Sequence, residues 1–324
     1  MEGNYELIII GGGPIGLACA IEAQRSGINC LIIEKGCLVN SLFNYPVNMA
    51  FFSTSERLEI GNVPFISNHA KPQRSEALEY YRRVAQSYQL PVHLFETVRR
   101  VESDTGSKKV VTDRAVYRAA YIIIATGFYD LPFLLNIPGE DLRKVKHYYD
   151  DPHFYAFQDV VVVGAMNSAV DAALETWRKG ARVTMVIRGA EIGKRVKYWV
   201  RPDIENRIRE GSIKAYFNST LAHIGEHDVS IHTPGGPVRI KNDWVLAMTG
   251  YQPDLDFLQR AGIELSGDEV RKPHHNEQSY ETNVPGIYVA GVICGGMDTH
   301  SLFIENAREH AEKIMSDINR KKQL

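Results

Sequence analysis

Hydrophobic residues along the chain gather in short continuous runs, and segments with helical spacing separate the runs. YELIII at 5–10 is the first run, segment 14–26 follows with apolar residues at helical spacing, and NCLIIE at 29–34 is the next run. Continuous apolar runs of this length are typical of parallel strands buried on both faces. Gly27 supplies a helix stop. Strand, helix and strand within about 30 residues predict a βαβ unit.

The middle of the chain repeats this pattern. DVVVVG at 159–164 predicts a strand, 167–179 predicts a helix that stops at Gly180, and RVTMVI at 182–187 predicts a second strand. The chain therefore contains two βαβ units. The remaining predicted elements are a helix over 76–88, a β-rich stretch over 92–117, strands over 119–127, 244–250 and 286–291, and a closing helix over about 300–316.

The order of these elements predicts an α/β protein in which one nucleotide-binding domain is inserted into another. The strand over 119–127 ends in ATG, and the strand over 244–250 ends in MTG. These paired loops mark the places where the chain leaves the first module and returns to it. We therefore expect two Rossmann-like domains: a first domain over 1–127 and 249–324, and an inserted domain over 128–248.

Composition narrows the class of partner. The chain has 324 residues, 44% hydrophobic and 23% charged, with a formal net charge of −2. These values are ordinary for a globular protein of two domains, and neither nucleic acid nor a membrane is expected as a partner. The four cysteines form no C-x-x-C and no zinc spacing, so we expect no metal site. No signal peptide or apolar span is apparent, which favours a cytoplasmic location.

The glycines after the first strand form a dinucleotide fingerprint. Gly11, Gly13 and Gly16 give G-x-G-x-x-G between a predicted strand and a predicted helix, with Pro14 and Ile15 inside the motif. The first glycine permits a tight turn, the second permits approach of a pyrophosphate, and the third permits close packing of helix on strand. Glu34 ends the next strand, where a carboxylate can accept hydrogen bonds from ribose hydroxyls. This set of residues predicts a dinucleotide site in the first domain.

The second module has a different charge preference. Gly164, Met166 and Ala169 occupy the three fingerprint positions, and Arg188 stands where the first module has Glu34. A guanidinium can bind a 2′-phosphate that a carboxylate would repel, so we interpret this module as an NADPH site. The competing interpretation is a solvated basic face, and it is favoured by Met166, whose side chain can obstruct a pyrophosphate. Two such sites together suggest hydride transfer from NADPH to a flavin and then to a substrate.

Several segments resemble a known family. IIIGGGPIGL, IIEKG, IIIATG, VVVVGAMNSAVDAA, VTMVIRG and TNVPGIYVAG are spaced as in the thioredoxin-reductase-like flavoproteins. LVNSLFNYPVNMAFFSTSERLEIG, RGAEIGKRVKYWVRPDIENRI and SLFIENAREHA resemble the bacillithiol-disulfide reductase family within that group. The resemblance implies a cytoplasmic homodimer or homotetramer that binds FAD and NADPH and reduces the disulfide of a low-molecular-weight thiol.

The resemblance also implies which residues contact the cofactors. For FAD these are Gly11, Gly13, Pro14, Ile15, Gly16, Glu34, Lys35, Asn40, Ser41, Asn48, Ala125, Thr126, Gly127, Gly291 and Val292. For NADPH they are Gly164, Asn167, Ser168, Ala169, Arg188, Lys194, Lys197, Gly250 and Tyr251. Tyr251 can stack near the nicotinamide or serve in packing alone.

Three departures from the family pattern bear on mechanism. The chain lacks the C-x-x-C of thioredoxin reductases, Val292 stands where many relatives carry Asp, and Ile15 stands where well-known members carry cysteine. Because Gly291 precedes Val292, its backbone is expected to serve the cofactor instead. One hypothesis is that Cys294 forms the mixed disulfide with the substrate, its pKa lowered by the N-terminus of the last helix. The alternative is a small buried side chain.

Three other functions fit parts of the pattern. ATGFYDLP and HYYDDPHFYAFQDVVVVGAMNSAVD also resemble flavin-containing monooxygenases. A thioredoxin-reductase-like ferredoxin–NADP reductase would lack C-x-x-C as well. A non-catalytic NADPH sensor is the third, and it would hold a flavin that NADPH does not reduce.

Overall fold

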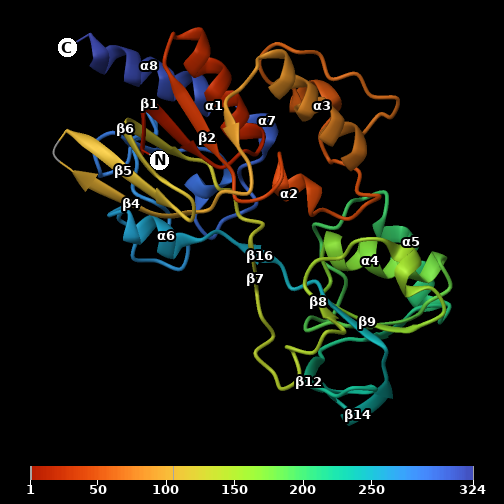
Figure 1. Ribbon diagram of the computed structural model, residues 1–324. Coiled ribbons are helices and arrows are strands. Elements are labelled where there is room, and N and C mark those ends of the chain that lie inside the picture. The colour runs from red at the N-terminus through yellow and green to blue at the C-terminus, as the bar shows by residue number, and fades with distance from the viewer. Residues whose placement is uncertain (1, 105, 324) are drawn as a thin grey trace. The chain divides into compact units, whose positions relative to one another are not determined.

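The computed structural model describes residues 2–104 and 106–323, and the chain divides into two compact units. Unit 1 comprises Met1–Phe43, Ser53–Leu131 and Gln252–Leu324, and unit 2 comprises Asn44–Phe52 and Pro132–Tyr251 (Figure 1). The two-residue strands β7 (Leu131–Pro132) and β16 (Tyr251–Gln252) lie where the chain passes between the units, and they pair with each other. The predicted α/β class with two nucleotide-binding-type sheets is confirmed.

Unit 1 contains a seven-stranded sheet in the part of the chain that the structure describes. Its parallel strands lie in the order β3-β2-β1-β6, with β17 beside β6, and the antiparallel pair β4–β5 joins β6. The strands are β1 (Glu2–Ile10), β2 (Cys30–Ile33), β3 (Val92–His93), β4 (Val98–Asp104), β5 (Ser107–Thr112), β6 (Val116–Ile124) and β17 (Ile287–Val289).

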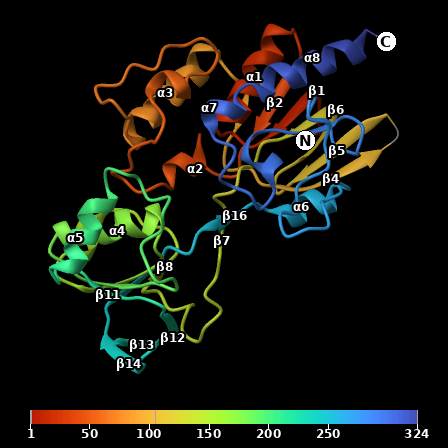
Figure 2. The same ribbon diagram turned by 180° about the vertical axis from the view of Figure 1, so that it is seen from behind.

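The alternation of side chains along β1 explains how both faces of this sheet are covered. Ile8 and Ile10 join a core with residues of the β4–β5 pair and of α6. Ile9 faces the opposite way, toward Gly16 in α1. Figures 1 and 2 both show α1 and α8 side by side over the sheet. The helices are α1 (Pro14–Arg25), α2 (Asn40–Phe43), α3 (Arg74–Ser87), α6 (Leu255–Arg260), α7 (Ile304–Ala307) and α8 (His310–Lys322), with 3-10 turns η1 (Ser55–Leu58) and η3 (Gly291–Gly295).

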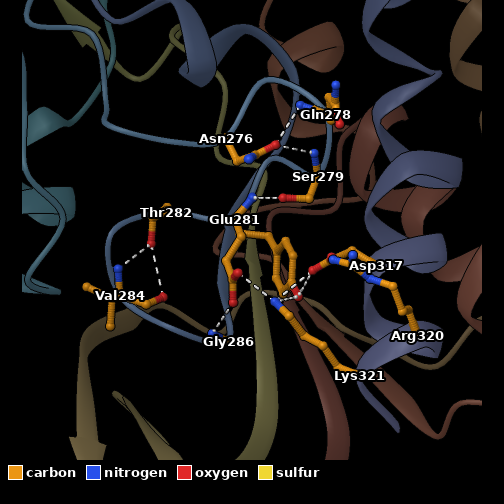
Figure 3. Close-up of polar contacts among 11 residues, drawn as sticks. Asn276, Gln278, Ser279, Glu281, Thr282, Val284, Gly286, Asp317, Arg320 and Lys321 are labelled. Atoms are coloured by element: carbon orange, nitrogen blue, oxygen red, sulfur yellow. Dashed lines mark hydrogen bonds and ion pairs between the residues drawn. The ribbon is translucent and has the colours of Figure 1, made fainter. Parts of the chain in front are cut away.

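A polar cluster fixes α8 to β17 and to the loop that precedes it. Asp317 accepts hydrogen bonds from the hydroxyl of Tyr288 at 2.8 Å and from the amine of Lys321 at 2.7 Å. That amine also pairs with Glu281 at 2.5 Å, and Glu281 accepts from the N–H of Gly286 at 2.8 Å. Figure 3 shows these side chains converging from α8 and from the loop before β17. The C-terminal helix is thus bound to the sheet by charge as well as by apolar packing.

Unit 2 contains a parallel sheet in the order β11-β10-β9-β15-β8 and a separate antiparallel sheet β12-β13-β14. Along β9, Val160 and Val162 pack with α4, whereas Val161 packs with the three-stranded sheet. The strands are β8 (Val145–Lys146), β9 (Asp159–Val163), β10 (Arg182–Val186), β11 (Lys214–Tyr216), β12 (Thr220–Ile224), β13 (Asp228–Thr233), β14 (Gly236–Lys241) and β15 (Trp244–Ala247). The helices are α4 (Asn167–Arg178) and α5 (Arg201–Arg209), with the 3-10 turn η2 (Pro152–Tyr155).

Three details differ from the sequence expectations. The units divide at 131/132 and 251/252, a few residues later than expected, and segment 44–52 lies with unit 2. The closing helix starts at Ile304 because Asn306 accepts a hydrogen bond from the N–H of Phe303 at 2.7 Å, which caps the helix there. It is also divided into α7 and α8. The antiparallel sheet β12–β14 was not predicted.

Candidate functional site

The carboxyl ends of the parallel strands in unit 1 meet at one edge of the sheet. The register pairs Ile10 with both Ile33 and Ile124, and it pairs Val289 with Ile124. The residues that follow these strand ends therefore lie at the same edge. They include Gly11, Glu34, Ala125, Thr126 and Gly291. In parallel α/β sheets this edge is where ligands bind.

The fingerprint glycines have the geometry that the motif requires. Gly11 has a φ of +111°, and a Cβ on Gly16 would lie 1.9 Å from the carbonyl oxygen of Gly11. Only glycine at position 16 lets α1 approach the turn so closely. A Cβ on Gly13 would meet nothing within 4 Å. The space in front of Gly13 is therefore open, as approach of a pyrophosphate would require.

An open pocket lies along this edge within unit 1. Predicted residues that line it are Gly11, Glu34, Lys35, Asn40, Ser41 and Thr126. Lining residues that the sequence reading missed are Ile10, Ile33, Glu96, Thr97, Val98, Asp130, Leu131, Asp254 and Phe257. Lys35 and Asp130 form an ion pair of 2.9 Å. Asp130 lies shortly after the ATG loop, a position that could have drawn attention to it.

Glu34 is held rigidly at the pocket. One carboxylate oxygen accepts from the N–H of Gly12 at 2.7 Å, and the other accepts from the N–H of Gly36 at 2.8 Å. Burial raises the pKa of Glu34, while the N–H groups of Gly36 and Gly12 act in the opposite direction. Each carboxylate oxygen has a further lone pair for a ligand hydroxyl.

A buried hydroxyl at the same pocket lacks a protein partner. Within the described residues, Oγ1 of Thr126 is buried and makes no hydrogen bond. A buried polar group without a partner is costly, and such a group at a binding site points to a ligand that completes it. This hydroxyl, the glycine turn and Glu34 form a donor and acceptor set that fits the ribose and pyrophosphate of FAD.

The turn after β17 does not present its first N–H to the pocket. Gly291 has a φ of +84°, and its N–H donates to Nδ1 of His310 at 3.2 Å. A Cβ on Gly291 would lie 3.3 Å from Cγ1 of Ile15. The N–H of Gly291 is therefore satisfied within the protein, and contact of the remaining backbone of this turn with the cofactor stays a prediction. Ile15 is buried and packs beside this turn.

The structure does not support an activated Cys294. The residue is only 2% exposed, and burial raises the pKa of its thiol. The expectation that the last helix lowers this pKa is wrong, because desolvation of the thiolate dominates. The sulfur lies 3.8 Å from Nδ1 of His310. Burial likewise raises the pKa of Cys19 to about 12 and that of Cys30 to about 11.

The second fingerprint lies in unit 2 at the end of β9. Gly164 has a φ of +126°, and a Cβ there would lie 2.5 Å from the carbonyl oxygen of Met248. Met166 precedes α4, and its sulfur lies against Gly193 in the loop after β10. Asn167, the first residue of α4, accepts from the N–H of Lys197 at 2.9 Å. Ser168 and Ala169 follow in the first turn of α4.

The cationic residues of this loop divide into two groups. Arg188 and Lys194 are exposed, as a phosphate ligand requires. Lys197 instead forms a largely buried ion pair of 3.0 Å with Asp171. Its amine is already neutralised, so Arg188 and Lys194 are the better candidates for contact with a 2′-phosphate.

Asn48 and Tyr251 also lie within unit 2. Asn48 donates to Glu175 at 3.3 Å. It belongs to unit 2 and is not among the residues that line the pocket in unit 1. Tyr251 is buried, stacks on Tyr148 at 5.2 Å and donates to the carbonyl of His147 at 2.6 Å. These contacts give Tyr251 a packing role, and it follows Gly250, whose φ is +96°.

The described residues offer neither a cluster of metal ligands nor a helix suited to crossing a membrane. In residues 2–104 and 106–323, no group of three or more His, Cys, Asp or Glu side chains is arranged to hold a metal ion. Over the same described ranges, no helix combines the length and the apolar character that crossing a membrane requires.

Comparison with known proteins agrees with this geometry. A family model described as pyridine nucleotide-disulphide oxidoreductase matches residues 8–291. The chain belongs to this family. Its sequence is 45% identical over 313 residues to bacilliredoxin reductase Bdr of Bacillus subtilis (strain 168), covering 96% of each chain.

Solved structures extend the match to the fold. Bacillithiol disulfide reductase Bdr from Staphylococcus aureus matches with a TM-score of 0.96 and 43% identity, over 99% of this chain and 100% of that one. The Bdr from Bacillus cereus matches with a TM-score of 0.95 and 44% identity, over 98% and 99%. The chain is therefore a flavin-dependent disulfide reductase-type oxidoreductase, and its cofactors are FAD and NADPH.

Proposed function

We propose that this protein uses NADPH to reduce the disulfide of a low-molecular-weight thiol of the bacillithiol type. The observation that carries the proposal is similarity along the whole chain to proteins named for bacillithiol disulfide or bacilliredoxin reduction. The sequence has no C-x-x-C for a dithiol relay to thioredoxin. An acceptor other than thioredoxin follows from that absence.

The pocket in unit 1 would hold FAD at the carboxyl ends of the parallel strands. The glycine turn at 11–16 would bind the pyrophosphate, Glu34 would accept from ribose hydroxyls, and Thr126 would gain a partner for its hydroxyl. When bound, the flavin supplies two-electron transfer between a nicotinamide and a disulfide. The chain's own task is to hold that group rigidly and to exclude water from it.

Unit 2 would select NADPH over NADH by its 2′-phosphate. Arg188 and Lys194 are exposed on the loop after β10, where they would bind the 2′-phosphate. Asn167 and Ser168 begin α4, whose first N–H groups have no partner inside the helix. These groups would bind the pyrophosphate.

The buried cysteines argue against a protein thiol as intermediate. Cys19, Cys30 and Cys294 are all buried with raised pKa values, and Ile15 has no redox chemistry. We therefore infer that electrons reach the acceptor disulfide without a mixed disulfide to Cys19, Cys30 or Cys294. Mass spectrometry after quenching a turnover mixture with acid would show the unmodified chain mass.

Anaerobic reoxidation of the flavin tests the proposal. NADPH is added in stoichiometric amount, loss of flavin absorbance is recorded, and the reduced protein is mixed with one acceptor at a time. Bacillithiol disulfide should restore the oxidised spectrum faster than glutathione disulfide, cystine or buffer. Restoration by no disulfide, or faster restoration by ferredoxin or by oxygen with an oxygenated product, would refute it.

We also propose that the protein is a cytoplasmic homo-oligomer. The resemblance described above supports this state, with a dimer or a tetramer as the expected size. Light scattering during size-exclusion chromatography would give the assembly mass, and a mass near the 36.5 kDa of one chain would contradict the proposal.

A further inference from the structure

The buried histidine at the start of α8 is not used by the function described so far. His310 is 2% exposed and is the first residue of α8. Its ring stacks on Tyr280 with centroids 3.9 Å apart, and Tyr280 stacks in turn on His275 at 5.6 Å. The imidazole is therefore fixed in orientation by aromatic packing on one side.

The polar contact of this ring is to the turn at the strand edge. Nδ1 of His310 accepts the N–H of Gly291, so the proton of a neutral imidazole resides on Nε2. A protonated ring would set one N–H against another at this contact. Burial lowers the pKa of His310 to about 4, and the charges of Lys313 and His275 act in the same direction. The ring is neutral throughout the physiological range.

The groups around the His310 ring leave Nδ1 able to accept the hydrogen bond from Gly291. Lys313 comes from the next turn of α8 and lies over the ring of Tyr280 at 5.7 Å. Cys294 has a raised pKa and remains a thiol, which also points at Nδ1 from 3.8 Å. Tyr280 and His275 also lie at this ring, and the carboxylates of Glu309 and Glu277 act on Tyr280.

Gly291 is constrained on three sides. Its φ of +84° favours glycine, Ile15 blocks space beside its Cα, and His310 holds its N–H. These contacts join α1, the end of β17 and α8. They also determine how the backbone from Gly291 to Val292 passes the edge where Gly11 and Thr126 lie.

We propose that His310 is a positioning residue for the flavin, acting through Gly291. Its neutral Nδ1 holds the turn after β17 in the shape that contacts bound FAD. The proposal rests on the placement of FAD in unit 1 under the proposed function. It does not depend on which disulfide is reduced.

Two substitutions distinguish the role of Nδ1 as a hydrogen-bond acceptor from the role of the ring in stacking on Tyr280. In His310→Asn the side-chain oxygen can occupy the place of Nδ1, but the stack on Tyr280 is lost. In His310→Phe the stack is kept, but the N–H of Gly291 loses its acceptor. We expect His310→Phe to weaken FAD binding by about tenfold, because a buried donor is left without a partner. We expect His310→Asn to retain FAD within about threefold of the wild type.

FAD affinity is measured by flavin fluorescence with apoprotein, and hydrogen exchange of the peptide that spans the Gly291 turn is measured on the same samples. Faster exchange of that peptide in His310→Phe, restored in His310→Asn, is the expected result. Equal exchange and equal FAD affinity in His310→Phe and the wild type would overturn the proposal. Loss in His310→Asn with retention in His310→Phe would also overturn it, since the stack would then be the functional contact.

A measurement on the unmodified protein guards against variants that fail to fold. Nitrogen NMR of histidine-labelled protein should show His310 as the Nε2–H tautomer at pH 7, with no titration between pH 5 and 8. An Nδ1–H tautomer, or a charged ring at pH 6, would refute the proposal. Neither readout involves a disulfide, so failure here and failure of the proposed substrate are distinguishable.

Discussion

The cluster around Asp317 provides a quantitative test of how α8 is held in unit 1. The side chain of Asp317 is 5% exposed and accepts from Tyr288 and Lys321, and it also pairs with Arg320 at 2.5 Å. Burial raises its pKa, but the hydrogen bonds from Lys321, Tyr288 and Arg320 outweigh that effect and lower it. The carboxylate is therefore ionised and fully engaged at neutral pH.

The expected cost of Asp317→Ala follows from these contacts. The substitution removes three hydrogen bonds to a buried charge. Those from Tyr288 and Lys321 contribute about 1.5 kcal/mol each and that from the exposed Arg320 contributes little, so unit 1 should lose about 3 kcal/mol. Tyr288→Phe removes one of them and should cost about 1.5 kcal/mol. The double variant should cost about as much as Asp317→Ala alone, because both changes remove the same hydrogen bond.

Arg320 is the matched control. It pairs with the same carboxylate, but its side chain is 73% exposed. Exposed ion pairs contribute about 0–1 kcal/mol, so Arg320→Ala should change stability little. Replacement of Lys321, which is 28% exposed, should cost more, because it removes the cationic partner of both Asp317 and Glu281.

The assay must report on unit 1 alone. All three tryptophans, Trp177, Trp199 and Trp244, lie in unit 2, so intrinsic fluorescence follows the other unit. Release of FAD in urea, followed by the rise in flavin fluorescence, reports on unit 1, and hydrogen exchange of the α8 peptide confirms it. Equal losses in Arg320→Ala and Asp317→Ala, or strict additivity of the Tyr288 and Asp317 changes, would refute the reasoning.

Four further predictions concern the cofactors and pH. Gly16→Ala should give protein that is purified without FAD. A Cβ at position 13 meets nothing within 4 Å, so Gly13→Ala should change the stability of the apoprotein by less than about 1 kcal/mol and lower only the affinity for FAD. Flavin absorbance at purification and urea titration of the apoprotein distinguish the two variants. Arg188→Glu should raise the KM for NADPH by about 10–100-fold and leave that for NADH unchanged in steady-state assays; equal changes for both would contradict the assignment. Thr126→Val should leave the apoprotein as stable as the wild type and weaken FAD binding about fivefold in fluorescence titration; unchanged affinity would show that the hydroxyl has no cofactor partner. Because the folded-state pKa of His310 is lowered from 6.5 to about 4, the unfolded chain takes up a proton first as pH falls, so stability should be complete above pH 6.5 and decline toward pH 4 by about 3 kcal/mol. Urea midpoints across this range should vary less in His310→Asn, and an identical slope in that variant would exclude His310 as the cause.

The strands and helices of the two βαβ units could be predicted because their signals are local. Runs such as 159–164 are buried on both faces, and Gly27 and Gly180 end helices at φ values of +67° and +87°. The sheet β12–β14 was missed because its strands are partly exposed and contain no continuous apolar run. Pro234 and Gly235, between β13 and β14, and Gly236, the first residue of β14, were the available hairpin signal.

The site was predictable where a motif fixes the backbone and not where tertiary packing decides. The glycine turn and Glu34 follow from spacing. The burial of Cys294, the pairing of Lys197 with Asp171 and the contact of His310 with Gly291 join distant segments. No local pattern marks them, because each depends on which elements pack together.

The pairing of β17 with β6 in the sheet of unit 1 has a consequence for the order in which the two units can fold during synthesis. β17 pairs with β6 at Ile122–Ile124, although about half of the chain separates the two strands. A ribosome-bound chain that ends before Ile287 exposes that edge of β6 and lacks α8, whereas Pro132–Tyr251 is already complete. We therefore expect capture of FAD to be among the last steps of maturation, and removal of the C-terminal segment should yield flavin-free protein rather than a weakened enzyme.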